Sequence, residues 1–494
     1  MFYIKWGYAK PDESILRKIH WIFNIFSCHG RRFIGEGRFL FAKKFSQASC
    51  LAFISTFHIS DFYMTSSTIG IIGLGYVGLP LSLQFARTGS TVLGFDIDPA
   101  KIKALEAGET YILHISSEAI RAQRDAGRFS ATTDLSRISE CEAIIICVPT
   151  PLAKHREPDL TYVLDTGRAI APHLQRGQLV VLESTTYPGT TDTELRAVLE
   201  AGSVLKAGVD FHLAFSPERE DPGNPQSDVA VIPKIVGGFT PECQKHALSV
   251  YGRAIKTLVP VESCRVAEAV KLTENIFRAV NIAMVNELKV VYAAMGIDIW
   301  DVIDAAKTKP FGFMPFYPGP GLGGHCIPID PFYLTWKARE YGQETRFIEL
   351  AGEVNTAMPA YVIQRVGEAL ASLHLTIRDS RILMIGIAYK SNVDDDRESP
   401  AYVLWDLLEQ QGAEVDYHDP HVPVIRPSRE HAHFAGRQSV ALEAGTLADY
   451  DLVLVATNHK AVDTALIAEN ARLVVDSRNA LSTLMKGKPN YFKA

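Results

Sequence analysis

The chain is 494 residues long, more than one compact domain usually holds, so two or three domains are expected. Its 47% hydrophobic and 21% charged content excludes a disordered or collagen-like chain. The net charge of −6, without a long basic stripe, argues against a nucleic-acid partner. The seven cysteines are scattered and never spaced as CxxC, so neither a disulfide framework nor a metal site is expected, and a cytoplasmic location suits them.

Residues 1–63 differ from the rest of the chain. They contain nine Lys or Arg residues against four Asp or Glu residues, and they lack both a clear periodicity and the pattern of a signal peptide. Met64 stands just before the first convincing strand. We interpret residues 1–64 as an extension of doubtful role. An upstream stretch translated from a start codon placed too early is favoured over a membrane-associating or regulatory segment.

Residues 62–86 carry no Asp, Glu, Lys or Arg, and this length could span a bilayer. The run is interrupted, however, by Gly70, Gly73, Gly75, Gly78 and Pro80. These residues fall where a strand would turn into a helix. The pattern favours a buried strand, turn and helix, and no stable membrane insertion is expected.

From Thr68 the chain alternates short apolar strands with helical segments, which is the pattern of a doubly wound parallel sheet. A helix is expected at residues 79–88. The expected strands of this first set are residues 68–72, 91–95, 143–148, 179–182, 213–215 and 234–236.

A second set of strands begins near Arg381 and comprises residues 382–387, 414–417, 452–456 and 473–475. In each set the second strand ends near an aspartate, Asp96 or Asp419. Between the sets, residues 261–295 contain no Gly or Pro and repeat apolar residues at helical spacing, which predicts a helix of about 28 residues, roughly 40 Å long. The sequence therefore predicts two Rossmann-like doubly wound domains, residues 65–260 and 376–494, joined by a central helical region, residues 261–375.

Residues 73–78 read Gly-Leu-Gly-Tyr-Val-Gly, the GxGxxG spacing, between an expected strand and an expected helix. Asp96 follows at the end of the next strand, where a carboxylate binds ribose hydroxyls and repels a 2′-phosphate, so NAD is favoured over NADP. Lys101 could reach the same ribose, although a solvated helix residue is the more ordinary reading. The cofactor contacts expected here are Gly73, Gly75, Tyr76, Val77, Gly78, Asp96 and Lys101.

Residues 317–331 form a loop in which glycines and prolines precede Cys326, and Asp330 follows four residues later. Such a loop presents a thiol with little steric cover. A buried structural cysteine is the ordinary alternative. A cysteine hydrolase using His325 is another, but it would leave the dinucleotide site unexplained.

Together with this loop and the GxGxxG turn, three further features carry a resemblance: EST at 183–185, SPERE at 216–220, and Lys271 with Asn275 on one expected helix. The chain resembles the nucleotide-sugar 6-dehydrogenases of the UDP-glucose/GDP-mannose dehydrogenase family over residues 68–479. The segments around Glu218 and Cys326 look most like the branch that oxidises UDP-N-acetylglucosamine for surface polysaccharides such as O-antigen. Pro222 and Ile329 replace residues common in UDP-glucose dehydrogenases, which also favours the N-acetyl-sugar branch.

The resemblance implies a four-electron oxidation of a primary alcohol to a carboxylate, using two NAD in succession. A cysteine beside the nicotinamide can capture the aldehyde as a thiohemiacetal, which is oxidised to a thioester and hydrolysed. Cys326 matches the family nucleophile, and Lys271 and Asn275, four residues apart on one helix face, match its oxyanion-stabilising pair. Asp330 and Thr185 match the pair that orients a water or the reacting hydroxyl, and Glu218 matches a carboxylate of thioester hydrolysis.

The remaining matches concern binding. The further expected cofactor contacts are Thr150, Thr185, Arg397 and Arg478. The expected substrate contacts are Glu218, Lys271, Asn275, Tyr317, Gly323 and Lys390.

Several alternatives stay open. The sugar could be that of UDP-glucose, UDP-N-acetylmannosamine or GDP-mannose, and the chain could instead be a two-electron alcohol dehydrogenase or a catalytically idle dinucleotide-binding regulator. Residues 261–295 carry apolar residues on more than one helix face, and the resemblance agrees, so a homodimer or dimer-based oligomer is expected.

Overall fold

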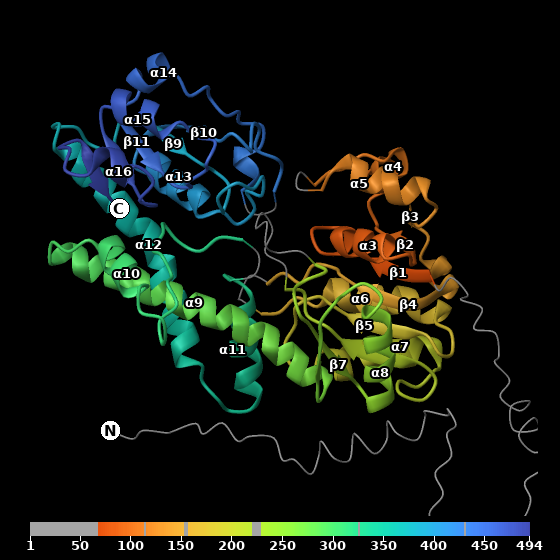
Figure 1. Ribbon diagram of the computed structural model, residues 1–494. Coiled ribbons are helices and arrows are strands. Elements are labelled where there is room, and N and C mark those ends of the chain that lie inside the picture. Colours follow the sequence, from red (N-terminus) through yellow and green to blue (C-terminus); the bar gives the residue numbers. More distant parts are fainter. Residues whose placement is uncertain (1–67, 113–114, 153–156, 220–228, 325–326, 429–430) are drawn as a thin grey trace, which may run out of the picture. The chain divides into compact units, whose positions relative to one another are not determined.

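The structure, a computed structural model, describes residues 68–112, 115–152, 157–219, 229–324, 327–428 and 431–494. These residues form two α/β domains connected along the chain by long helices (Figure 1). The predicted fold class is therefore confirmed. The N-terminal extension, His325 and Cys326 lie outside the described residues.

The first domain is built on an eight-stranded sheet in the order β3-β2-β1-β4-β5-β6-β7-β8. All neighbouring strands are parallel except β6 and β7, which are antiparallel, so the expectation of a wholly parallel sheet is wrong there. Antiparallel neighbours need no crossover helix between them. The strands span Thr68–Ile72 (β1), Thr91–Phe95 (β2), Phe129–Thr132 (β3), Cys141–Ile146 (β4), Leu179–Leu182 (β5), His212–Phe215 (β6), Lys234–Gly238 (β7) and Leu258–Val261 (β8).

Helices cover both faces of this sheet. One buried cluster joins the sheet to α3, α4, α5 and α8, and a second joins it to α6, α7 and the start of α9. Side-chain oxygens of Asp98, Ser116 and Thr240 cap α4, α5 and α8, which fixes where these helices begin. The helices span Gly78–Arg87 (α3), Pro99–Ala107 (α4), Ser117–Asp125 (α5), Thr161–Ile170 (α6), Arg196–Ser203 (α7) and Pro241–Tyr251 (α8), with short helical segments at Leu135–Glu140 (η1), Ala171–His173 (η2) and Thr191–Leu195 (η3, a π-helix).

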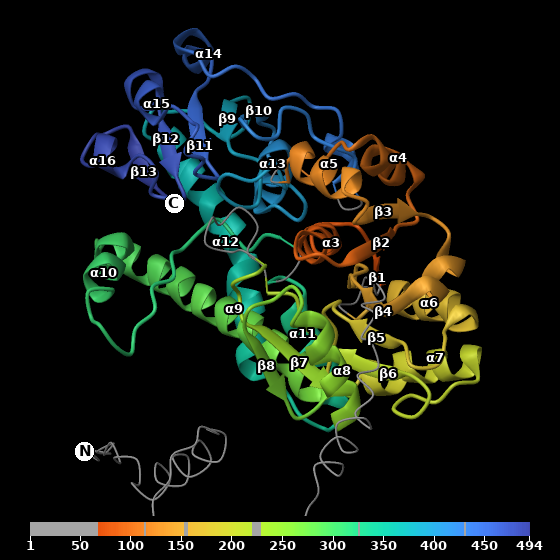
Figure 2. The same cartoon turned by 45° about the vertical axis from the view of Figure 1, so that its right-hand side comes forward.

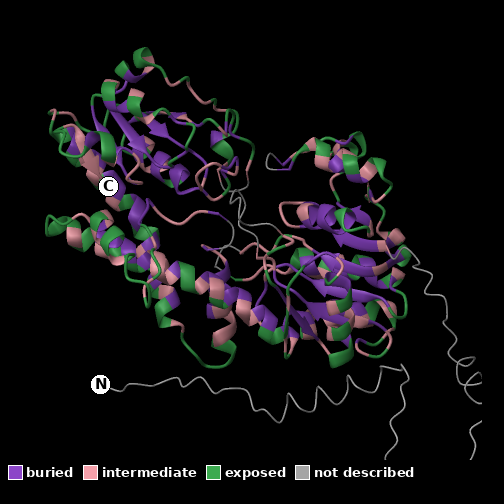
Figure 3. Cartoon of the chain, in the orientation of Figure 1, coloured by how far each residue is buried: buried purple, intermediate pink, exposed green. Residues whose placement is uncertain are grey.

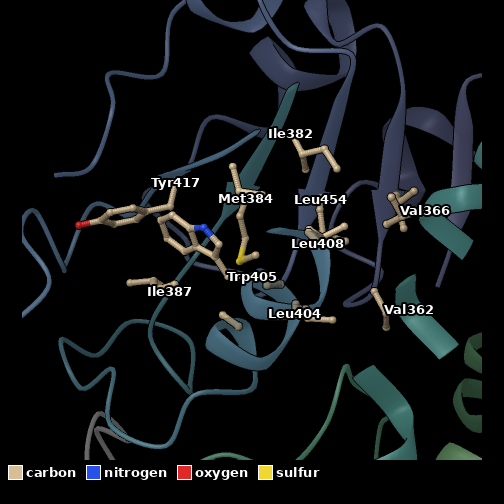
Figure 4. Packing of buried hydrophobic residues seen from close by; sticks show 14 of the residues in the cluster. Val362, Val366, Ile382, Met384, Ile387, Leu404, Trp405, Leu408, Tyr417 and Leu454 are labelled. Carbon is tan, nitrogen blue, oxygen red and sulfur yellow. The ribbon is translucent and has the colours of Figure 1, made fainter. Parts of the chain in front are cut away.

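The second domain has a five-stranded parallel sheet in the order β10-β9-β11-β12-β13. On one face Trp405 and Leu408 pack against Met384 and Tyr417 (Figure 4). The strands span Arg381–Ile385 (β9), Glu414–His418 (β10), Leu452–Val455 (β11), Val474–Asp476 (β12) and Tyr491–Lys493 (β13). The covering helices are Pro400–Gln410 (α13), Ala444–Ala448 (α14), Thr464–Asn470 (α15) and Ser482–Met485 (α16), with a 3₁₀ turn at Ala432–Phe434 (η4).

The long central helix is α9, Cys264–Ala294, whose first turn is capped by Ser263. It is followed by α10 (Ile299–Ala306), α11 (Asp330–Glu340) and α12 (Arg346–Ala371). Helix α12 packs against α9 (Figure 2). Both helices alternate buried and exposed residues, whereas the central strands of the two sheets are buried (Figure 3). At 1.5 Å per residue α9 is about 46 Å long, which agrees with the predicted connecting role.

Candidate active site

The turn after β1 has the geometry that a dinucleotide requires. Gly73 has φ +92°, and its N–H donates to the Phe95 carbonyl at 2.8 Å. A Cβ at Gly73 would lie 2.7 Å from the Cys147 carbonyl oxygen, and one at Gly78 only 1.9 Å from the Gly73 oxygen, so packing demands glycine at both positions. A Cβ at Gly75 would meet nothing within 4 Å, so this position faces open space that a ligand can approach.

Asp96 lies against this turn and is hydrogen-bonded to it. Its Oδ2 accepts from the Leu74 N–H at 3.0 Å and from Lys101 Nζ at 2.9 Å, and its Oδ1 accepts from the Asp98 N–H. The structure therefore places Lys101 beside Asp96, and the shared ribose site stays a prediction. No side chain caps the start of α3 at Val77. The Leu79 and Leu81 N–H groups donate to the Gly75 and Val77 carbonyls and Pro80 has no N–H, so Gly78 supplies the N–H of this first turn that can face a pyrophosphate. These residues fit NAD.

A second cluster of polar residues is built on α9. Lys271 Nζ donates to the Glu218 carbonyl at 2.6 Å and to its Oε2 at 3.0 Å. One turn later, Asn275 Nδ2 donates to Asp330 Oδ2 at 2.6 Å. Burial raises the pKa of Asp330 to about 7, against the positive charge of Lys271 and the Asn275 hydrogen bond. The structure thus brings together Lys271, Asn275, Glu218 and Asp330.

Helix α11 connects this cluster with the two loops that carry Thr150 and Thr185. It begins at Asp330, and one turn later the hydroxyl of the buried Tyr333 donates to the carbonyl oxygen of Thr150 and lies 3.3 Å from that of Pro151. Tyr333 also packs with Leu272 of α9 and with Tyr187, two residues after Thr185. The Thr150 loop and the Thr185 loop therefore meet α9 through buried tyrosines.

The second domain contributes Arg397, whose guanidinium lies 4.6 Å from the centre of the Tyr76 ring in the dinucleotide turn. Both ends of the guanidinium are held by Asp395 at 2.7 Å. This contact places Arg397 against the dinucleotide turn, and its contact with the cofactor stays a prediction. Arg478 lies against the loop at 317–331 that carries Cys326 (the cysteine loop): a Cβ at Gly319 would lie 2.4 Å from its Nη1.

The other residues expected to bind substrate fall on the same loop or against it. A Cβ at Gly323 would lie 2.9 Å from the Cβ of Tyr389, so this glycine lets the cysteine loop approach the segment that carries Lys390. Tyr317 instead stacks on Trp300 of α10, and its hydroxyl donates to Asp304. Its ring is thus held at α10, not in the polar cluster.

Sequence reasoning missed three buried side chains that organise this site. Tyr333 is described above. Asn286 Oδ1 accepts from the Gly319 N–H at 3.0 Å and so attaches the cysteine loop to α9. Glu268 lies one turn before Lys271, and this i, i+3 spacing on an expected helix is a signal that could have found it.

The domain that bears the dinucleotide turn also bears the Thr150 loop, which Tyr333 joins to α9 and its buried cluster of a lysine, an amide and carboxylates, an arrangement that suits a dehydrogenase. Models of the UDP-glucose/GDP-mannose dehydrogenase family match the chain over residues 67–255 (NAD binding domain), 265–357 (central domain) and 383–483 (UDP binding domain). The chain therefore belongs to this family and is an NAD-dependent nucleotide-sugar 6-dehydrogenase.

The relatives act on several sugars. The chain is 37% identical over 360 residues to a UDP-N-acetyl-D-glucosamine 6-dehydrogenase of Pseudomonas aeruginosa, covering 73% of this chain and 84% of the relative. It is 34% identical to an NDP-N-acetyl-D-galactosaminuronic acid dehydrogenase of Ralstonia solanacearum, covering 84% and 96%. A solved UDP-D-ManNAc dehydrogenase of Pyrococcus horikoshii matches with a TM-score of 0.77 and 31% identity, covering 86% of this chain and 98% of that one.

No helix among the described residues is long and apolar enough to cross a membrane. Nor does that part of the chain hold a group of three or more His, Cys, Asp or Glu side chains that could bind a metal ion.

Proposed function

We propose that the protein oxidises the C6 alcohol of a UDP-N-acetylhexosamine, with UDP-N-acetylglucosamine favoured, to the uronic acid through a thioester on Cys326. The observation that carries the proposal is the pairing along one face of α9, where Lys271 meets Glu218 and Asn275 meets Asp330. These four groups are the ones needed to stabilise an oxyanion and to orient a hydroxyl or a water.

In the first oxidation C6 loses a hydride and its hydroxyl loses a proton, which gives an aldehyde. NAD, when bound, supplies the hydride acceptor for this step and for the second oxidation. A carboxylate with the pKa of Asp330 can take the proton near neutral pH, with Thr185 orienting the reacting hydroxyl. Because Asp330 lies close to Lys271 and Asn275, an oxyanion that develops beside Asp330 would be near these two hydrogen-bond donors.

Cys326 then captures the aldehyde. A carbon–sulfur bond forms, the thiol proton goes to the carbonyl oxygen, and the thiohemiacetal loses a second hydride and its hydroxyl proton to become a thioester. Water, oriented by Asp330 and Thr185 and assisted by Glu218, breaks the carbon–sulfur bond. This hydrolysis yields the carboxylate and restores the thiol.

The N-acetyl-sugar assignment draws on two independent features. The relatives named above act on N-acetylated sugars or their uronic acids, and Pro222 and Ile329 depart from the pattern of UDP-glucose dehydrogenases. We assign NAD binding to residues 65–260, the catalytic and dimerising region to 261–375 and UDP-sugar binding to 376–494. The product is a precursor for surface polysaccharide, O-antigen included.

A homodimer through α9 completes the proposal. Several large apolar side chains of this helix and its C-terminal cap are at least 39% exposed in the single chain: Phe277, Met284, Val290 and Val291 of the helix and Met295 at the cap. Solvent exposure of so many apolar residues on one helix is unfavourable, and a second copy of the helix would cover them in an isologous interface.

The test is the stoichiometry of purified enzyme against a panel of UDP- and GDP-sugars. Two NADH per sugar with UDP-N-acetylglucosamine as the best substrate is the expected result. One NADH per sugar with free aldehyde would contradict the thioester route, and a preference for UDP-glucose would contradict the sugar assignment. Cys326→Ser should form no acid, because a hydroxyl is a far weaker nucleophile than a thiolate near neutral pH.

A further inference from the structure

Glu268 is a buried carboxylate that the proposed mechanism does not use. It lies on α9, one turn before Lys271, and is fully buried. Three donors converge on it: the Gly189 N–H at 2.6 Å, the Thr191 N–H at 2.9 Å and the Thr191 hydroxyl at 2.7 Å. The carboxylate therefore attaches the chain segment 189–191 to the catalytic helix.

The chemistry of the contact is specific for a carboxylate. An ionised carboxylate only accepts hydrogen bonds, so it can satisfy all three donors, whereas a glutamine amide would direct its own N–H₂ group at one of them. Burial raises the pKa of Glu268 to about 7 against the effect of these hydrogen bonds. A buried carboxylate is costly to the fold unless its hydrogen bonds offset the desolvation, and here all the partners come from one short segment.

The attached segment continues the loop that carries Thr185. It enters the π-helix η3, Thr191–Leu195, a distortion of helical geometry that is frequent at functional sites. A second residue of α9, Arg265, donates to Asp192 at 2.8 Å. Helix α9 therefore holds this segment at two points, and Glu268 provides the buried one.

We propose that Glu268 is a positioning residue that fixes the Thr185 loop in register with the face of α9 that bears Lys271 and Asn275. Positions i, i+3 and i+7 of a helix share one face, so Glu268 and the proposed oxyanion donors Lys271 and Asn275 belong to one rigid element. A shift of the loop along α9 would displace Thr185 from the hydroxyl or water that it orients and from its expected contact with NAD, while the other groups expected to bind the sugar and NAD stay in place. The inference rests on the proposed function of Thr185.

A double-mutant cycle between Glu268→Gln and Thr185→Val tests the proposal. Glu268→Gln alone should lower kcat about ten- to a hundredfold, while the KM values for NAD and for the UDP-sugar stay within about threefold. In the Thr185→Val background the same change should lower kcat by less than about threefold, because the residue that it positions is already gone. Equal losses in both backgrounds, or a loss confined to KM, would overturn the proposal.

Two further variants separate positioning from folding. Glu268→Asp keeps the charge at shorter reach and should have a kcat between those of the wild type and Glu268→Gln. Thr191→Val removes only the hydroxyl donor. If Glu268→Gln does not fold, the cycle of Thr191→Val with Thr185→Val decides the matter by the same criterion of non-additivity.

Glu106→Gln on the exposed surface of α4 is the control for loss of a glutamate, and its kcat should match that of the wild type. If the wild-type enzyme turns over its sugar but the losses of kcat in the two single variants are additive in the double variant, this inference alone is refuted. A wild type that oxidises none of the UDP-sugars refutes the proposed function as well.

Discussion

Replacing Asp330 by asparagine should abolish acid formation and, above neutral pH, stabilise the protein. Asp330 is buried, and burial raises the pKa of its carboxyl group from 3.8 to about 7, although Lys271 and Asn275 oppose the shift. A carboxyl group with a raised folded-state pKa stabilises the fold fully below its unfolded-state pKa. That contribution is lost as the pH rises through the folded-state pKa of about 7.

The magnitude follows from these two pKa values. Between about pH 5 and about pH 8, the titration of this one group should lower the free energy of unfolding of the wild type by about 2 to 3 kcal/mol, at 1.36 kcal/mol per pKa unit over roughly two units. The asparagine variant lacks the titration, and its side-chain oxygen can still accept from Asn275. Its free energy of unfolding relative to the wild type should therefore increase by about 2 to 3 kcal/mol over this pH range.

Urea unfolding followed by tryptophan fluorescence, on both proteins at both pH values, measures the difference. Asp125→Asn, at a carboxylate that is 63% exposed on α5, controls for the loss of one surface charge. A stability difference between Asp330→Asn and the wild type that is the same at both pH values would refute the reasoning. Asp330 would then not titrate near neutral pH, and its assignment as a proton acceptor would fail with it.

Three further predictions concern other parts of the chain. Removing residues 1–63 should leave solubility and kcat unchanged, and an insoluble or inactive product would make the extension part of the enzyme. Val291→Glu should convert the proposed dimer to monomer in light scattering and lower activity, because it introduces a charge on the apolar face of α9; a wild type that is a fully active monomer would contradict the dimer. Lys271→Met should reduce kcat about a hundred- to a thousandfold through loss of an oxyanion donor, and a kcat within tenfold of wild type would exclude that role.

The elements that sequence alone predicted are those whose signals are local. The turn at 73–78 and the helix at 264–294 are encoded by contiguous residues, and both are confirmed. The three strands that were not predicted, β3, β8 and β13, all lie at sheet edges. Edge strands are less apolar than central ones, and β8 contains Pro260, which is unusual within a strand.

The contacts of the site were beyond the reach of local patterns because they join distant residues. Lys271 meets Glu218 across 53 positions, and Asn275 meets Asp330 across 55. The resemblance supplied these residues as members of a site without saying which of them pair. Glu268 shows the same limit, because its helix face was predictable but its partners lie 77 and 79 positions away.

The two Rossmann-like domains use one carboxylate position in opposite ways. Gly73 and Gly386 occupy equivalent turns, each with a positive φ and an N–H donating at 2.8 Å to the strand that precedes Asp96 or Asp419. Asp96 accepts from two backbone N–H groups and one partly exposed lysine.

Asp419 is instead saturated. Its fully buried side chain accepts from five donors, namely the N–H groups of Ile387, Ala388, His421 and Val422 and Nε2–H of His459. Although burial opposes it, the His459 hydrogen bond and charge, with the backbone donors, lower the pKa of Asp419 to about 2. A carboxylate offers about four lone-pair sites, so none remains for a ribose. In the second domain this carboxylate position supports the domain's own loops, and of these two carboxylates only Asp96, with three donors for about four lone-pair sites, keeps an acceptor site that a ribose hydroxyl could use.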